Sequence, residues 1–181
     1  MTLANPISHF ELTDDYLDGD FDGFIDELEP AVEDSRILVV DDDARAATLM
    51  SRLLERDGFR RVVTACDGER ALEILFDRPP DVVVLDVHLP HIDGFEVLRE
   101  ILRHDLEVGR VTGIVAISGD ATASTCQTML WAGADDFISR PFASAEFAQR
   151  VRRIAHRTRA LRQALGHARL LDGRLRGVSP Q

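Results

Sequence analysis

The stretch that decides the fold is Val82-Val83-Val84-Leu85-Asp86, an apolar run that ends in a carboxylate. A second run of this kind, Ile37-Leu38-Val39-Val40, ends in Asp41-Asp42. Both runs are short, rich in β-branched residues and free of polar alternation, which predicts strands that are buried on both faces. Such strands occur in open parallel α/β sheets, where ligands bind just beyond the carboxyl ends of the strands.

Three carboxylates, those of Asp41, Asp42 and Asp86, are therefore expected around one point if the two strands are neighbours. Carboxylates that lie so close repel each other unless a cation joins them. An all-oxygen ligand set favours a hard ion, and a small pocket that retains water favours Mg²⁺. The sequence thus predicts a magnesium site at this edge of the sheet.

Around these two runs the chain alternates between strand and helix patterns. Strands are predicted at 36–40, 61–65, 81–86, 112–118 and 135–138, and helices at 44–57, 67–77, 94–104, 122–132 and from 143 onward. Gly58 and Gly133 are expected helix stops, and Pro79-Pro80 ends the second helix. Asp93 is the expected N-cap of the third helix. Five strand–helix units predict an α/β fold with a doubly wound, five-stranded parallel sheet of the flavodoxin-like type, (βα)5.

Four motifs, taken together and in order, resemble the receiver domain of two-component response regulators over about residues 36–160. They are the acidic pair in ILVVDD, the aspartate in VVVLDVHLPHIDG, the hydroxyl of Ser118 in VAISGD, and ADDFISRPF near the end. The resemblance implies the strand order 2-1-3-4-5. It also implies a phosphorelay protein in which Asp86 accepts a phosphoryl group from a sensor histidine kinase or a phosphotransfer protein.

The resemblance further implies a role for each residue around Asp86. Mg²⁺, for which Mn²⁺ can substitute, is expected on Asp41, Asp42, Asp86 and the backbone carbonyl of His88. Ser118 and Arg140 are the expected partners of the phosphoryl oxygens, and Phe137 is the expected switch aromatic. Once phosphorylated, the site would draw the Ser118 hydroxyl inward, and Phe137 would follow into the vacated space.

Arg140 departs from the family pattern, which has a lysine before the Pro-Phe pair. Arginine is larger and planar, and it makes bidentate contacts that lysine cannot make. The chain contains no lysine at all, so a general use of arginine and a change specific to this site both remain open. The resemblance also implies a cis peptide bond before Pro141.

Charge divides the chain into three segments. Residues 1–35 hold 11 acidic and no basic residues, residues 36–143 hold 19 acidic residues and 12 arginines, and residues 144–181 hold 2 acidic residues and 9 arginines. We expect an acidic N-terminal extension, a receiver core, and a basic, extended last helix with a tail. The two ends either attract each other or form separate binding surfaces. The net charge of −11 argues against nucleic-acid binding by the chain as a whole.

The composition predicts a cytoplasmic protein without a membrane partner. No run of about 18 apolar residues is present, and the N-terminus lacks the pattern of a signal peptide. Cys66 and Cys126 fit a reducing compartment and do not have the spacing of metal ligands.

The last helix is predicted to continue past the receiver. Its seam positions alternate in spacing between four and three residues, which is a heptad pattern that includes Phe147, Val151, Ile154, Leu161 and Leu165. The pattern favours a homodimer, or a link to an effector, through this helix. In the alternative, the helix packs through its first three seam residues and then frays.

Residues 18–29 read DGDFDGFIDELE and match the calcium loop of EF-hands. The candidate Ca²⁺ ligands are Asp18, Asp20, Asp22, the carbonyl of Phe24, Asp26 and Glu29. Pro30 would interrupt the exiting helix, and no second loop pairs with this one. The alternative is an acidic segment that folds on a partner.

The expected function is phosphorylation-controlled signalling to a downstream protein effector, with no enzyme activity beyond the domain's own phosphorylation and dephosphorylation. A phosphohydrolase is disfavoured, because Val87 and His88 follow Asp86 in place of a second carboxylate that could act as general acid. Two alternatives stay open. One is a non-phosphorylated docking module, and the other is the regulatory front part of a longer signalling protein such as a cyclic-dinucleotide enzyme. Direct control of transcription by this chain alone is not expected, since too little sequence follows residue 160 for a DNA-binding module.

Overall fold

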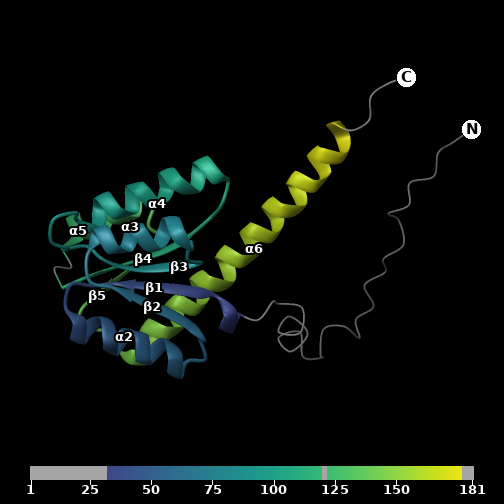
Figure 1. The fold of residues 1–181 in the computed structure, drawn as a ribbon. Coiled ribbons are helices and arrows are strands. Elements are labelled where there is room, and N and C mark those ends of the chain that lie inside the picture. Colours follow the sequence, from purple (N-terminus) through teal and green to yellow (C-terminus); the bar gives the residue numbers. More distant parts are fainter. Residues whose placement is uncertain (1–31, 120–121, 177–181) are drawn as a thin grey trace, which may run out of the picture. The chain divides into compact units, whose positions relative to one another are not determined.

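The computed structural model describes residues 32–119 and 122–176, which belong to one compact unit. In chain order the elements are η2 (Val32–Asp34, a 3₁₀ turn), β1 (Arg36–Val40), α2 (Ala44–Arg56), β2 (Arg61–Ala65), α3 (Gly68–Asp77), β3 (Val82–Asp86), α4 (Gly94–Val108), β4 (Gly113–Ser118), α5 (Ala123–Ala132), β5 (Asp136–Ser139) and α6 (Ser144–Arg176) (Figure 1). Within these residues the strands form one parallel sheet in the order β2-β1-β3-β4-β5. The predicted fold class and strand order are both confirmed.

The sheet separates two apolar layers (Figure 1). Alternate residues of a strand point to opposite faces. In β1, Ile37 and Val39 belong to the layer shared with α2 and α6, whereas Leu38 and Val40 belong to the layer shared with α3, α4 and α5. The strands β3 and β4 are buried at every position, so their apolar runs have no polar alternation.

The predicted element boundaries agree with the structure to within one residue, with one exception. Helix α4 was expected to end at 104 but continues to Val108, where Gly109 ends it in the left-handed conformation (φ 62°). Asp93 is the N-cap of this helix, as predicted, and its carboxylate accepts a hydrogen bond from the N–H of Glu96. Gly58 and Gly133 have positive φ angles just past α2 and α5, as expected of helix stops.

Helix α6 packs on the sheet through its first turns and then continues well beyond them. Phe147, Val151 and Ile154 are buried, whereas Leu161 and Leu165, on the same seam, are 42% and 41% exposed. The helix continues to Arg176. No helix among the described residues has the length and apolarity that crossing a membrane requires.

Two arginines of α6 attach its second half to the loops before β3 and β4. Arg162 is paired with Asp81 and donates to the carbonyls of Pro80 and Val111, and Arg169 donates to the Gly109 carbonyl over 2.8 Å. Burial lowers the pKa of Arg162 to about 10. These bonds satisfy backbone carbonyls at the end of α4 and hold the extension of α6 in place.

A buried aspartate fixes the start of β4, the strand that ends at Ser118. Asp105 accepts hydrogen bonds from the backbone N–H of Thr112 and, over 3.0 Å, from its hydroxyl. Burial raises the pKa of Asp105 above its ordinary 3.8, against the opposing effects of these bonds and of Arg110. The folded state therefore keeps this proton to a higher pH than the unfolded state does. The stability contributed by this proton is complete below the unfolded pKa and is lost as the pH rises through the folded pKa.

We expect the wild type to gain stability over Asp105→Asn as the pH falls from about 7 to about 4, because only the wild type can take up this proton. Urea denaturation of both proteins across this range measures the difference. Asp77→Asn, at an exposed ion pair with Arg78, is the matched control and should show no such trend. A difference that is flat, or that shrinks with falling pH, would contradict the raised pKa.

Two seam residues of α6 are expected to differ in their contribution to stability. Ile154→Ala should lower the free energy of unfolding by about 2–5 kcal/mol, because it leaves a cavity in the core. Leu161→Ala should cost less than about 1 kcal/mol in the monomer, because its side chain is already half exposed. Chemical denaturation of both variants at low protein concentration measures this. Equal losses would mean that the two positions are packed alike.

Candidate functional site

The carboxyl ends of β1 and β3 bring the three predicted carboxylates together. These strands pair in parallel, with Val40 opposite Leu85. Asp41 follows Val40 and Asp86 follows Leu85, so the two aspartates lie side by side at adjacent strand ends. Each of Asp41, Asp42 and Asp86 offers a carboxylate oxygen within 4.8 Å of the others. Asp41 and Asp86 are buried, and Asp42 is exposed. The predicted cluster is confirmed.

The loop after β3 holds Asp86 through its backbone. The N–H of His88 donates to Asp86 Oδ1 over 3.1 Å, and the N–H of Gly94 donates to the Val87 carbonyl over 3.0 Å. A Cβ atom at residue 94 would collide with the backbone carbonyl of Asp86. Only glycine therefore allows α4 to begin this close to the acidic residue. The His88 carbonyl lies in this loop, and its role as a ligand stays a prediction.

Arg140 enters the cluster from the end of β5 and contacts two of the carboxylates. Its Nη1 donates to Asp86 Oδ2 over 3.0 Å, and its Nη2 donates to Asp41 Oδ2. The backbone N–H of Arg140 donates to the Ser118 carbonyl over 2.8 Å, which ties the loop to β4. The Arg140–Pro141 bond is cis, as the resemblance implied. From the sequence, Arg140 was expected at the phosphoryl oxygens on Asp86, and its bond to Asp41 was not indicated.

Burial and charge oppose each other at Asp41. Removal of this carboxylate from water raises its pKa, and the neighbouring negative charge of Asp86 raises it further. The Arg140 guanidinium and the N–H of Asp43, which donates to Asp41 Oδ1 over 2.9 Å, act in the opposite direction. The buried carboxylate thus depends on fixed donors of its own chain for compensation.

Ser118 and Phe137 lie on one face of the sheet. Ser118 is the last residue of β4 and is fully buried. Phe137 is half-buried on β5 opposite Ala116, and both pack in the layer of α3, α4 and α5. Because residues two apart in a strand share a face, Ser118 points to the same side as Ala116. Ser118 therefore lies diagonally from Phe137 on neighbouring strands of the same face.

The donor set fits a hard divalent cation. It consists of carboxylate oxygens alone, two of them from buried residues, at the edge where an open α/β sheet binds ligands. Asp41, Asp42 and Asp86 are the residues that could hold such an ion. The predicted calcium ligands between Asp18 and Glu29 lie outside the described residues.

An apolar recess beside Arg140 was missed from the sequence. It has a volume of about 430 Å³ and is lined by Ala46, Leu49, Met50, Arg140, Pro141 and Phe142. Leu49 is 57% exposed although it lies on a helix that packs on the core. The lining joins α2 to the loop after β5, which are far apart in the sequence, so no local pattern could have indicated the recess.

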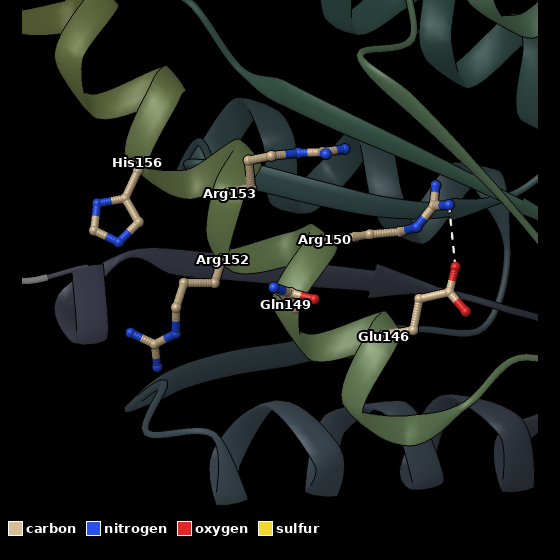
Figure 2. Close-up of a pocket in the computed structure, with 6 residues that line it drawn as sticks. All are labelled: Glu146, Gln149, Arg150, Arg152, Arg153 and His156. Atoms are coloured by element: carbon tan, nitrogen blue, oxygen red, sulfur yellow. Dashed lines mark ion pairs between the residues drawn. The ribbon is translucent and has the colours of Figure 1, made fainter.

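A second hollow lies along α6 and has a volume of about 590 Å³ (Figure 2). Its lining residues are Glu146, Gln149, Arg150, Arg152, Arg153 and His156. Each of its three arginines is paired with carboxylates of the same chain: Arg150 with Glu146 and Asp136, Arg152 with Glu33 and Asp57, and Arg153 with Asp136. The basic composition of this stretch thus serves to attach α6 to the domain.

The geometry agrees with comparisons to known proteins. The family model described as "Response regulator receiver domain" matches residues 37–152. Response regulator MprA of Mycobacterium sp. (strain KMS) is 38% identical over 123 residues, which are 68% of this chain and 51% of MprA. The alkaline phosphatase synthesis transcriptional regulatory protein PhoP of Bacillus subtilis (strain 168) is 37% identical over 123 residues, which are 68% of this chain and 49% of PhoP. The chain spans about half the length of these relatives.

Solved structures give the same result. The receiver domain of NtrX from Brucella abortus has a TM-score of 0.60 and 33% identity, and the match covers 66% of this chain and 97% of that one. The Francisella response regulator 1452 receiver domain has a TM-score of 0.63 and 27% identity, and the match covers 69% of this chain and 99% of that one. The chain therefore belongs to the response regulator receiver domain family of two-component systems.

Proposed function

We propose that this receiver is switched by transfer of a phosphoryl group from a histidine kinase or a phosphotransfer protein to Asp86. The observation that carries the proposal is the cluster itself. It places one buried carboxylate at the end of β3, next to two further carboxylates and within hydrogen-bond distance of a guanidinium. No other group of His, Cys, Asp or Glu side chains among the described residues forms a comparable metal-binding cluster.

In the proposed reaction, a carboxylate oxygen of Asp86 attacks the phosphorus of the donor phosphohistidine, and the imidazole leaves with the bonding electron pair. Asp41, Asp42, Asp86 and the His88 carbonyl would hold Mg²⁺, which would supply positive charge for the phosphoryl oxygens. The Arg140 guanidinium already bonds Asp86 and can donate to a phosphoryl oxygen from the same place. Catalysis then consists mainly of positioning and of stabilising charge.

Contacts around β5 support a route from Asp86 to α6. The new phosphoryl oxygens attract the Ser118 hydroxyl, and the ring of Phe137 responds along the same face. Arg150 of α6 donates to the Phe137 carbonyl over 3.3 Å and to Asp136 over 2.9 Å. Because the bond to Phe137 is made by its backbone carbonyl, a shift of β5 that accompanies the ring would change the hydrogen bonds of α6, which is how a local change of charge can act on a distant surface.

The apolar recess beside Arg140 supports docking of the phosphodonor at this edge. Leu49, Pro141 and Phe142 offer apolar surface in the same recess that Arg140 lines, and the Arg140 guanidinium contacts Asp86. An amphipathic helix that carries the phosphohistidine could place its apolar face here. Such docking would exclude water from the transfer.

The exposed seam of α6 supports output through protein contacts. Leu161 and Leu165 are half exposed on a helix that continues to Arg176. A second copy of α6, or a helix of an effector, could cover them through the heptad pattern. The longer relative PhoP carries the name of a transcriptional regulatory protein, which agrees with an effector downstream of the receiver.

A non-phosphorylated docking module is the second candidate, and the bond between Arg140 and Asp41 is the observation that favours it. This bond neutralises part of the cluster without any phosphoryl group or metal. The two candidates differ in one outcome, which is whether Asp86 can be modified.

Incubation with a small acyl-phosphate donor and Mg²⁺ is expected to add one phosphoryl group to the wild type and none to Asp86→Asn. Intact-protein mass spectrometry, followed by peptide mapping, measures the modification. Asp77→Asn, at an exposed helix position far from the cluster, is the control and should be modified like the wild type. No adduct with any donor would favour the docking module.

Arg140→Lys is expected to shorten the lifetime of the phosphorylated form by about tenfold, which is the effect of losing one charge-assisted hydrogen bond. A lysine ammonium keeps the charge but cannot make the bidentate contact. Loss of phosphate from the purified phosphoprotein, followed by mass over time, measures the lifetime. An unchanged lifetime would mean that arginine only replaces lysine at this position.

A further inference from the structure

Arg140 bridges two aspartates that would otherwise share a metal ion. Its two terminal nitrogens bond the Oδ2 atoms of Asp41 and Asp86. The two remaining oxygens, both Oδ1, accept from the backbone N–H groups of Asp43 and His88. All four carboxylate oxygens of the buried pair therefore already have a donor from the chain.

The planar shape of the guanidinium makes this bridge possible. Two nitrogens of one rigid group point at two different carboxylates at once. A lysine ammonium is a single point of charge on a flexible stem, and it does not fix two carboxylates in one geometry in this way. The bridge is thus a property of arginine at position 140.

The obstacle to a metal ion is position and not net charge. Three carboxylates and one guanidinium leave an excess of negative charge, which still attracts a divalent cation. Such an ion binds through the same carboxylate oxygens that the guanidinium holds. Asp41 is fully buried, so its carboxylate has little freedom to turn a new oxygen toward an incoming ion.

We propose that Arg140 is a built-in competitor of magnesium: the arm of the guanidinium on Asp41 must leave before the ion binds there. The magnesium site is part of the function proposed above, and this inference rests on it. Displacement frees Nη2 while Nη1 stays near Asp86. The freed arm is then available to a phosphoryl oxygen, so metal binding prepares the arginine for phosphoryl transfer.

The test is a Mg²⁺ titration of the full chain at constant ionic strength, without any phosphodonor. The reporter is the NMR signal of the Asp43 amide, because this N–H donates to Asp41 and therefore lies at the proposed site. Arg140→Lys keeps the charge and removes the bridge. Arg152→Lys is the matched control, because Arg152 also bonds two carboxylates, those of Asp57 and Glu33, and is 29% exposed against 27% for Arg140.

We expect Arg140→Lys to lower the Kd for Mg²⁺ about tenfold relative to the wild type, and Arg152→Lys to leave it unchanged. While both arms are held, the Arg140 guanidinium rotates slowly and its Nη groups give separate NMR signals. When the wild type is saturated with Mg²⁺ and one arm is free, rotation should become faster and these signals should average.

Equal Kd values for the wild type and Arg140→Lys would overturn the competition and leave the magnesium site standing. The competition would also be wrong if the Nη signals of Arg140 stayed unchanged at saturation. If the Asp43 amide responded to Mg²⁺ in neither protein, the proposed magnesium site would fail, and this inference with it.

Discussion

The rest of the structure depends on the parallel pairing of β1 with β3, which places two buried carboxylates at adjacent strand ends. Asp41 and Asp86 are removed from water and lie close enough to repel each other. Such an arrangement costs free energy unless a cation and fixed hydrogen-bond donors compensate it. In this chain the compensation comes from Arg140 and from the backbone N–H groups of Asp43 and His88.

This compensation connects the site to the rest of the sheet. Arg140 follows β5, its N–H is bonded to the Ser118 carbonyl at the end of β4, and its side chain reaches Asp86 on β3. With Asp41 at the end of β1, four strand ends are therefore joined by one residue. The proposed change of charge at Asp86 would alter the partner of Arg140 and hence the loop that leads into α6. The arrangement that stabilises the buried carboxylates would then also make this loop sensitive to the proposed modification.

Helix α6 is attached to the domain along much of its length, which suits it to report such a change. Arg150 binds the β5 backbone, Arg152 binds the end of α2, and Arg162 and Arg169 bind the loop after α4. Since guanidinium groups satisfy backbone carbonyls at these points, a shift of the strands changes the bonds of the helix. The exposed Leu165 lies between Arg162 and Arg169 in the sequence, and the exposed Leu161 directly precedes Arg162.

The sequence by itself determined the strands, their buried character and the identity of the acidic residues, because unbroken β-branched runs such as Val82–Leu85 have one stable environment. Helix ends marked by glycine, proline or an aspartate cap were predictable for the same local reason. Gly109 marks the end of α4 by the same kind of signal, but the prediction ended this helix at 104 and missed its last turn. Only the tertiary structure decided that Arg140 reaches Asp41 as well as Asp86, and that α2 and the loop after β5 enclose an apolar recess. Both features join segments that are far apart in the chain, and their geometry depends on how the layers pack.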